Sequence, residues 1–226
     1  MYAMVFTRPD IAYHTSRLAA SMQSPSNEAY DAVMNLLHYL YHTRHMGITF
    51  GPADANRVRD DDIERSEPRV WSDASWGGRE FQPYGGGYIE FYFGPIIWVS
   101  RKMKFVPLST CEAEVAAMVM LAKEVLFVRG ILQDLGETMA GPIITVTDSK
   151  AANDTIVNAG VTKHTVHFER WLHFARSLQL RNIIKSVLVS TDIMRADDKT
   201  KVVDKKKFNF CRRAIMNLPA DTKDFL

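Results

Sequence analysis

The chain has 226 residues, enough for one large domain or for a domain with an appendage. Hydrophobic residues make up 46% and charged residues 24%, an ordinary globular composition that excludes wholesale disorder. The formal net charge is only +2, so a polyanionic partner would have to be bound by a local basic patch and not by the field of the whole molecule.

The first fifty residues predict a small helical unit. A short helix is expected around residues 8–22. In SPSNEAYDAVMNLLHYLYHTRHMG, Ser24 can cap a second helix, Pro25 suits its first position and Gly47 can end it. The apolar residues of this stretch follow helical spacing, namely Tyr30, Val33, Met34, Leu37, Leu40 and Tyr41. Residues 48–50 (ITF) favour a strand.

The segment 51–68 is polar, charged and nearly free of large apolar residues, which predicts a solvated linker. An acidic recognition loop is the alternative, although nothing in the sequence names its partner.

After residue 68 the predicted elements change from helices to a series of strands and helices. Glycine and proline turns separate three predicted strands: RVWSDAS, GGYIEFYFG and IIWVSRK. A long helix from Ser109 to Leu135 follows, and Gly136 can terminate it. The remaining predicted elements are the strand PIITVTDS, the short helix AANDTIVNAG, the helix HTVHFERWLHFARSLQL, the strand IIKSVLVS and a basic helical tail over residues 196–217. This order predicts an α/β fold with a mixed five-stranded sheet, three antiparallel strands and then parallel ones, flanked by helices and preceded by a helical appendage.

Two aspartates stand on strands that are expected to be central. Asp73 lies within the first strand, and Asp148 closes the apolar run IITVT. Because ligands of open α/β sheets bind beyond the carboxyl ends of the strands, the two carboxylates are expected to face one crevice. Each alone is more often a strand-end or turn residue.

The segment STCEAEVAAM holds two glutamates with different explanations. Ser109 and Glu112 have the spacing of a capping box, which is a sufficient structural reason for Glu112. Glu114 has no such reason, so it is the preferred functional acid. A fourth acid is sought in MRADDKTK, in Asp197 or Asp198, where a favourable interaction with a helix dipole is the competing explanation.

Four carboxylates that lie together repel one another unless cations neutralise them. Mg²⁺ prefers oxygen ligands and pairs readily with phosphate oxygens. Two such ions about 3.5–4 Å apart can orient a water molecule and stabilise the leaving oxygen of a phosphodiester. The acids therefore point to phosphodiester hydrolysis.

Eight motifs in order resemble the carboxyl-terminal part of a copia-type LTR retrotransposon polyprotein, which contains the end of the reverse transcriptase and the ribonuclease H domain. They are TRPDIAY, LLHYLYHTRHMGITF, SDASWGG, GGGYIEFYFGPIIWVSRKMK, LSTCEAEVAAM, VTDSKAA, TKHTVHFERWLHFAR and ADDKTK. The resemblance implies a reverse transcriptase remnant over 1–50, a linker over 51–68, a ribonuclease H domain over 69–218 and a tail over 219–226.

The resemblance also implies an activity, cleavage of the RNA strand of RNA–DNA hybrids with two Mg²⁺ ions, for which Mn²⁺ can substitute. The matched catalytic and metal-binding residues are Asp73, Glu114, Asp148 and Asp197. The implied partners are the hybrid and the upstream reverse transcriptase of the same polyprotein, with no membrane. The expected location is the cytoplasm, in the virus-like particle of the element, with the nucleus as the alternative.

Several positions depart from the family pattern. Val115 replaces a usual tyrosine, Arg195 replaces a usual leucine, and two valines follow ADDKTK in place of proline and leucine. The match of the last acid to the family pattern is therefore ambiguous, which leaves Asp198 as a second candidate and Asp192 as a weaker one. These departures leave a second hypothesis open, in which the chain comes from a decayed or domesticated copy of the element. In that case it would be a catalytically silent nucleic-acid-binding or scaffolding domain. A transposase-like strand transferase of the same fold is disfavoured by the four acids.

A hybrid would be recognised by its shape, its phosphates and its 2′-hydroxyls. The basic candidates for this contact, together with one histidine, are Arg101, Lys102, Lys104, Lys150, Lys163, His164, Lys205 and Lys206. A solvated helix face is the alternative explanation of the terminal lysines, and helix capping or packing is the alternative for His164.

Overall fold

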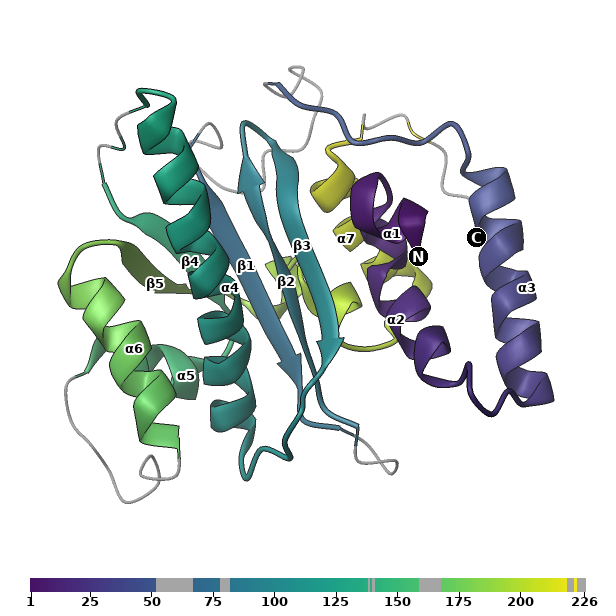
Figure 1. The fold of residues 1–226 in the computed structure, drawn as a ribbon, viewed down its shortest axis with the longest axis horizontal. Coiled ribbons are helices and arrows are strands. Elements are labelled where there is room, and N and C mark those ends of the chain that lie inside the picture. Colours follow the sequence, from purple (N-terminus) through teal and green to yellow (C-terminus); the bar gives the residue numbers. More distant parts are fainter. Residues whose placement is uncertain are drawn as a thin grey trace.

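The structure, a computed structural model, describes residues 1–51, 67–77, 82–137, 139, 141–158, 168–218 and 222. Its centre is one five-stranded sheet with the order β3-β2-β1-β4-β5 (Figure 1). The strands are β1 (Arg69–Ser75), β2 (Tyr84–Phe91), β3 (Gly94–Lys102), β4 (Ile143–Thr147) and β5 (Ile184–Leu188). β1, β2 and β3 pair antiparallel, whereas β4 is parallel to both β1 and β5. The prediction of a mixed sheet is confirmed.

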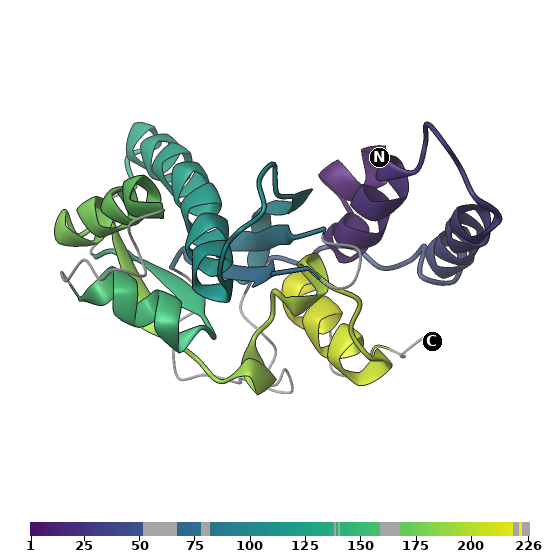
Figure 2. The same ribbon diagram turned by 90° about the horizontal axis from the view of Figure 1, so that it is seen from below.

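Helices cover both faces of the sheet. They are α4 (Thr110–Asp134), α5 (Lys150–Val157), α6 (Glu169–Leu180) and α7 (Lys205–Met216). Figure 2 shows α4 and α7 on opposite sides of the sheet. Alternate residues of β1 explain this layering, since Val70 packs into the core with Leu121 of α4, while Trp71 packs with Ile215 of α7.

The long helix α4 begins and ends where the sequence predicts. The Ser109 hydroxyl accepts a hydrogen bond from the Glu112 N–H at 3.1 Å, which satisfies one of the free donors of the first turn. Gly136 follows the helix with a φ of +83°, a conformation that glycine adopts without strain. The helix predicted from residue 164 begins at Glu169 among the described residues, and residues 159–167 lie outside them.

The basic tail is only partly helical, contrary to the prediction for 196–217. Two short 3₁₀ segments, η3 (Thr191–Ile193) and η4 (Asp197–Lys199), precede α7. The α-helix starts late because Asp204 is its N-cap, with its carboxylate accepting a hydrogen bond from the Lys207 N–H at 2.9 Å. The loop with η4 is thereby free to lie across the sheet.

The N-terminal segment contains α1 (Tyr2–Phe6), η1 (Pro9–Ile11), α2 (Ala12–Ala20) and α3 (Asn27–His42). Two boundary predictions for α3 are wrong. Its cap is Ser26, whose hydroxyl accepts from the Ala29 N–H at 3.2 Å, and it ends at Thr43, before the glycine expected to end it. The strand predicted over 48–50 is also wrong, because this stretch makes only isolated backbone bonds such as Thr49 N–H to Met216 O at 3.0 Å.

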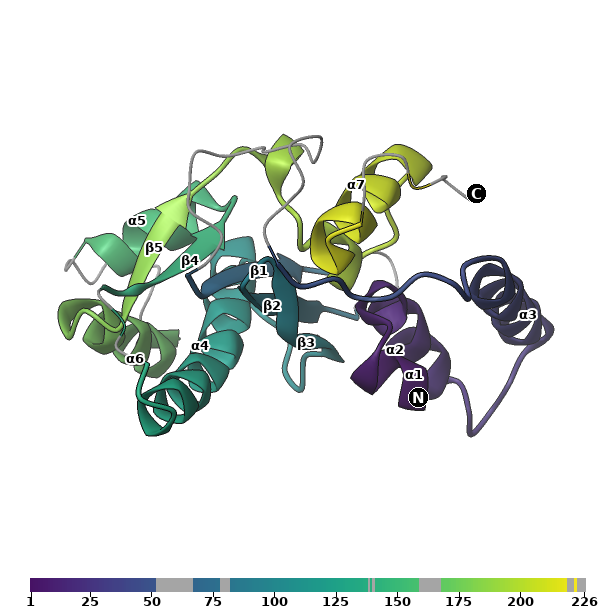
Figure 3. The ribbon, with the colours of Figure 1, turned by 90° about the horizontal axis from the view of Figure 1, so that it is seen from above.

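The apolar spacing of α3 predicts a helix but not a buried one. Figure 3 shows α3 standing apart from the sheet, with α1 and α2 between them. Among the described residues none of the α3 side chains is buried, and its apolar residues Tyr30, Val33, Met34, Leu37 and Tyr41 are exposed. The helix therefore presents an uncovered apolar face.

Other parts of the N-terminal segment are joined to one another by buried polar groups, and the segment also contacts β3. Arg8 forms a buried ion pair with Asp10 at 2.7 Å, and the Tyr39 hydroxyl donates to Asp10 at 2.5 Å. The Trp98 indole on β3 donates to the Met4 carbonyl at 2.6 Å. The predicted division at 51–68 stays a prediction, because residues 52–66 lie outside the described part, as does most of the tail over 219–226.

Within the described ranges, no helix combines the length and the apolar character that crossing a membrane requires.

Candidate active site

The parallel strands β1 and β4 separate at their carboxyl ends. They pair only where Arg69–Trp71 faces Ile144–Val146. Asp73 lies two positions after Trp71, and Asp148 lies two positions after Val146, so the alternation of side chains places both carboxylates on the same face where the strands diverge. A crevice of this kind is where open α/β sheets bind ligands.

The third carboxylate comes from the loop that contains η4. This loop lies directly on β2, opposite the register position Asp73–Gly86. A Cβ atom on Gly86 would lie 2.8 Å from the carbonyl oxygen of Lys199, and the Ser100 hydroxyl donates to the same carbonyl at 2.6 Å. Gly86, which has no side chain, therefore admits the backbone that carries Asp197.

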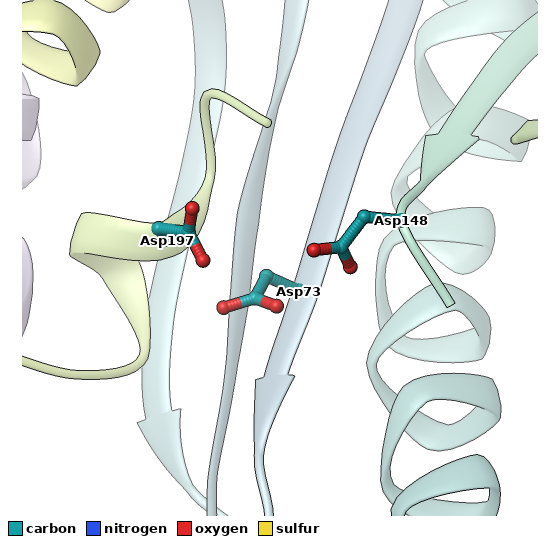
Figure 4. Close-up of side chains that lie close together, drawn as sticks. All are labelled: Asp73, Asp148 and Asp197. Carbon is teal, nitrogen blue, oxygen red and sulfur yellow. The ribbon is translucent and has the colours of Figure 1, made fainter. Parts of the chain in front are cut away.

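Asp73, Asp148 and Asp197 converge (Figure 4). One carboxylate oxygen of each lies within 4.8 Å of the others. Asp73 and Asp197 are each only 2% exposed, while Asp148 is half-buried. Three acids that lie up to 124 positions apart in the chain thus come together at one site.

Glu114 approaches the same pocket from α4. It is 9% exposed, a hydrogen bond joins its carboxylate to the backbone of Ala74, and its Oε2 has no hydrogen-bond partner among the described residues. Burial first, and then the charges of Asp73 and Asp148, raise the pKa of Glu114 to about 9. Glu112, by contrast, turns back to accept from the Leu108 N–H at 2.5 Å, which is a capping role.

Cationic and hydroxyl groups already surround the aspartates. Burial raises the pKa of Asp73 to about 6, while Lys201 and a hydrogen bond from the Thr200 hydroxyl oppose this rise. The Lys201 ammonium lies 2.6 Å from Asp197 Oδ1 and 3.7 Å from Asp73 Oδ2. The Lys207 ammonium lies 2.9 Å from Asp197 Oδ2.

The rivals of Asp197 lie elsewhere. Asp198 pairs with the buried ammonium of Lys199 at 2.5 Å, and its pKa is raised mainly by burial. It does not belong to the three-carboxylate group formed among the described residues. Asp192 is exposed, and its N–H bonds to the Ser190 hydroxyl in a local turn. Geometry therefore favours Asp197 over both.

The described basic candidates are all exposed: Arg101, Lys102, Lys104, Lys150, Lys205 and Lys206. Lys102 pairs through Tyr84 with Ser75, so it shares the sheet face of Asp73, whereas Arg101 pairs through Gly85 with Ala74 and faces the α4 side. The remaining two candidates, Lys163 and His164, lie outside the described residues.

Reasoning from the sequence missed three groups at this site. They are Thr200, Lys201 and Lys207. Lys201 was detectable in principle, since the motif ADDKTK places it four positions after Asp197, but nothing local indicates that its ammonium also approaches Asp73. That approach depends on the loop crossing β2.

The donor set fits a divalent cation. Three carboxylates offer oxygen ligands within a small radius, which is the chemistry that Mg²⁺ and Mn²⁺ prefer. The pKa of Asp73 and of Glu114 is raised first by burial and then by the neighbouring carboxylates, and a bound cation would offset both effects.

A mixed sheet of this strand order, with carboxylates gathered where β1 and β4 part, defines a ribonuclease H-like protein. No family model matches the chain. It is 31% identical over 217 residues to the retrovirus-related Pol polyprotein from transposon TNT 1-94 of Nicotiana tabacum, a match that covers 95% of this chain and 15% of the relative. Over nearly its whole length the chain is therefore similar to retrovirus-related Pol polyproteins of copia-type transposons.

A second relative is similar to the chain over almost the same length. The Pol polyprotein from transposon RE2 of Arabidopsis thaliana is 29% identical over 215 residues, covering 93% of this chain and 14% of the relative. The chain thus spans about one seventh of the length of these curated relatives. Among solved structures, LC11-RNase H1 isolated from compost is similar with a TM-score of 0.48 and 15% identity, over 60% of this chain and 93% of that chain.

Proposed function

We propose that the chain is an endonuclease that hydrolyses the RNA strand of RNA–DNA hybrids during reverse transcription of a retrotransposon. The observation that carries this proposal is the convergence of Asp73, Asp148 and Asp197 at the divergence of β1 and β4. The similarity of the chain to retrovirus-related Pol polyproteins supports it.

The proposed cofactor is a pair of Mg²⁺ ions, with Mn²⁺ as a substitute. Asp73, Asp148 and Asp197 would hold them, together with Glu114. When bound, such a pair can orient a water molecule and stabilise the leaving oxygen of a phosphodiester.

The chain's own groups prepare this pocket. The Thr200 hydroxyl donates to Asp73 Oδ2 and fixes the rotation of that carboxylate. Lys207, held by the carbonyls of Thr191 at 2.6 Å and Asp192 at 3.2 Å, keeps Asp197 Oδ2 in place. Burial keeps a proton on Glu114 at neutral pH when no cation is bound.

The hybrid would lie across the carboxylate face and be held through its phosphates. Lys102 is exposed on β3, on the sheet face of Asp73, and Lys150 is exposed two positions after Asp148. Lys205 and Lys206 are exposed at the start of α7. Such contacts make affinity fall with rising salt.

The proposed protein partner is the upstream reverse transcriptase portion of the same polyprotein, acting in the cytoplasm within a virus-like particle. The uncovered apolar face of α3, with Val33, Leu37 and Tyr41 exposed, is the surface that supports such a contact.

The test of activity is cleavage of a labelled RNA–DNA hybrid by the purified chain with Mg²⁺. Asp148→Asn removes one ligand charge without changing volume and should reduce cleavage to background. Asp154→Asn is the matched control, because Asp154 is exposed on α5 and touches none of the three acids.

The catalytically silent alternative gives a different result. It predicts that the wild-type chain binds the hybrid without metal-dependent cleavage, and that Asp73→Asn leaves binding unchanged. That outcome would replace the endonuclease proposal with a scaffolding role.

A further inference from the structure

We propose that Lys201 is a tethered counter-ion of the three-aspartate site: its ammonium takes the place of a divalent cation between Asp73 and Asp197 and must leave when that cation binds. The inference rests on the proposed function, since it concerns the same pocket, and it assigns a role to a residue that the carboxylate chemistry does not require.

The first step is the position of the ammonium. Lys201 Nζ lies 2.6 Å from Asp197 Oδ1 and 3.7 Å from Asp73 Oδ2, so one positive charge bridges two acids that are each 2% exposed. Oxygens of these two acids also belong to the group that could hold a metal ion. A cation on those oxygens and the ammonium would compete for the same space and charge.

The second step is the contrast between the two lysines at Asp197. Lys207 is 18% exposed in its side chain, and two backbone carbonyls, of Thr191 and Asp192, hold its ammonium besides the carboxylate. The Lys201 side chain is 43% exposed, and within the described part of the chain its ammonium contacts the carboxylates of Asp73 and Asp197. Lys207 is therefore fixed in place, whereas Lys201 can swing toward solvent on its long side chain.

The third step is the consequence for the protein without metal. Asp73, Asp148 and Asp197 would repel one another if all were ionised, and Lys201 offsets this repulsion. The pocket thus keeps its shape before cation binding. The same contact weakens cation binding, because the ammonium must first be displaced.

The experiment measures Mn²⁺ binding by titration calorimetry and thermal unfolding in chelator, without nucleic acid. The variants are Lys201→Met, Lys201→Arg and the control Lys185→Met. Lys185 is exposed and pairs with Ile144, toward the opposite end of β4 from Asp148. Neither measurement depends on catalysis.

We expect Lys201→Met to bind Mn²⁺ on the order of tenfold more tightly, which is the scale of one partly screened charge contact. The same variant should unfold at a lower temperature in chelator and recover when Mn²⁺ is added. Lys201→Arg, which keeps the charge, should stay near wild type, and Lys185→Met should change neither property.

Two results would overturn the inference, and they are distinguishable. If wild type binds Mn²⁺ and Lys201→Met binds it equally or more weakly, Lys201 is not a competitor, while the proposed metal site survives. If neither protein binds Mn²⁺, the metal site and the inference fall together. Binding by Lys201→Met alone would support the inference and show that the lysine closes the site.

Discussion

Arg195 stands where the resemblance implies a leucine, and the structure buries its side chain. Its guanidinium lies 4.7 Å from the centre of the Trp71 ring and 3.8 Å from Glu90 Oε2. Arg195 and Glu90 are 2% and 1% exposed. The departure from the family pattern therefore belongs to a buried charge pair stacked on an aromatic ring, two positions before Asp197.

Replacing Arg195 should be costly for stability. Arg195→Leu removes a cation from beside the buried Glu90 carboxyl group, so we expect a loss of about 3 kcal/mol in the free energy of unfolding. The measurement is urea unfolding followed by circular dichroism. The double variant Arg195→Leu with Glu90→Gln should recover part of the loss. If the double variant loses as much stability as Arg195→Leu alone, the pairing of Arg195 with Glu90 is contradicted.

Asp73 gives a prediction about pH. Its pKa is raised from 3.8 to about 6, so the folded protein holds a proton that the unfolded chain releases at lower pH. The free energy of unfolding, measured in chelator, should therefore fall as the pH rises from about 4 to about 6. Asp73→Asn removes the titrating group, so it should gain stability relative to wild type, by roughly a few degrees in Tm, above about pH 6 but not below about pH 4.

Thermal unfolding at several pH values, always with chelator, checks this expectation. Asp154→Asn is the control, because Asp154 is exposed on α5. A difference between Asp73→Asn and wild type that does not vary with pH would contradict the raised pKa.

At the scale of elements, β2 and the η4 loop act as a unit. Gly86 lies opposite Asp73, and the space above it is taken by the backbone carbonyl of Lys199, which Ser100 also holds. Gly86 thus leaves room on this face of β2 for a second backbone. It sets the position of Asp197 relative to Asp73.

Adding one methyl group at Gly86 tests this arrangement. In Gly86→Ala the new Cβ would lie 2.8 Å from two backbone oxygens, so the loop must shift. We expect a loss of about 1–3 kcal/mol in stability and weaker Mn²⁺ binding by calorimetry. Gly130→Ala on α4, where a Cβ meets nothing within 4 Å, is the matched control and should bind as wild type does.

For the whole molecule, buried polar groups join the elements of the N-terminal segment, and further hydrogen bonds link this segment to α7 and β3. Asp10 is fully buried, paired with Arg8, and accepts from Tyr39 on α3. Arg212 of α7 approaches the Tyr39 hydroxyl at 3.5 Å, and the Trp98 indole bonds to the N-terminal helix. Contacts of this kind favour cooperative unfolding of the two parts.

Calorimetry of the full chain should therefore show one transition. Asp10→Ala leaves Arg8 buried without its carboxylate, and we expect it to lower that single transition by about 3 kcal/mol or more. Two separate transitions in wild type, with only the first affected by Asp10→Ala, would show that the segments unfold independently.

Much of the architecture was predictable because its signals are local. Alternating and continuous apolar runs placed the strands, Ser109 and Gly136 bounded α4, and the capping box separated Glu112 from Glu114. The boundaries of α3 were missed because Ser24 and Ser26 are both credible caps by sequence, and only hydrogen-bond geometry selects one of them.

The sequence by itself determined the types of element and the four candidate acids, because periodicity, capping and motif order are properties of neighbouring residues. Only the tertiary structure brings Asp197, and not Asp198, together with Asp73 and Asp148, places Lys201 between two carboxylates and leaves the apolar face of α3 uncovered. These outcomes depend on which backbone lies across which strand, and contacts between residues more than a hundred positions apart leave no local pattern in the chain.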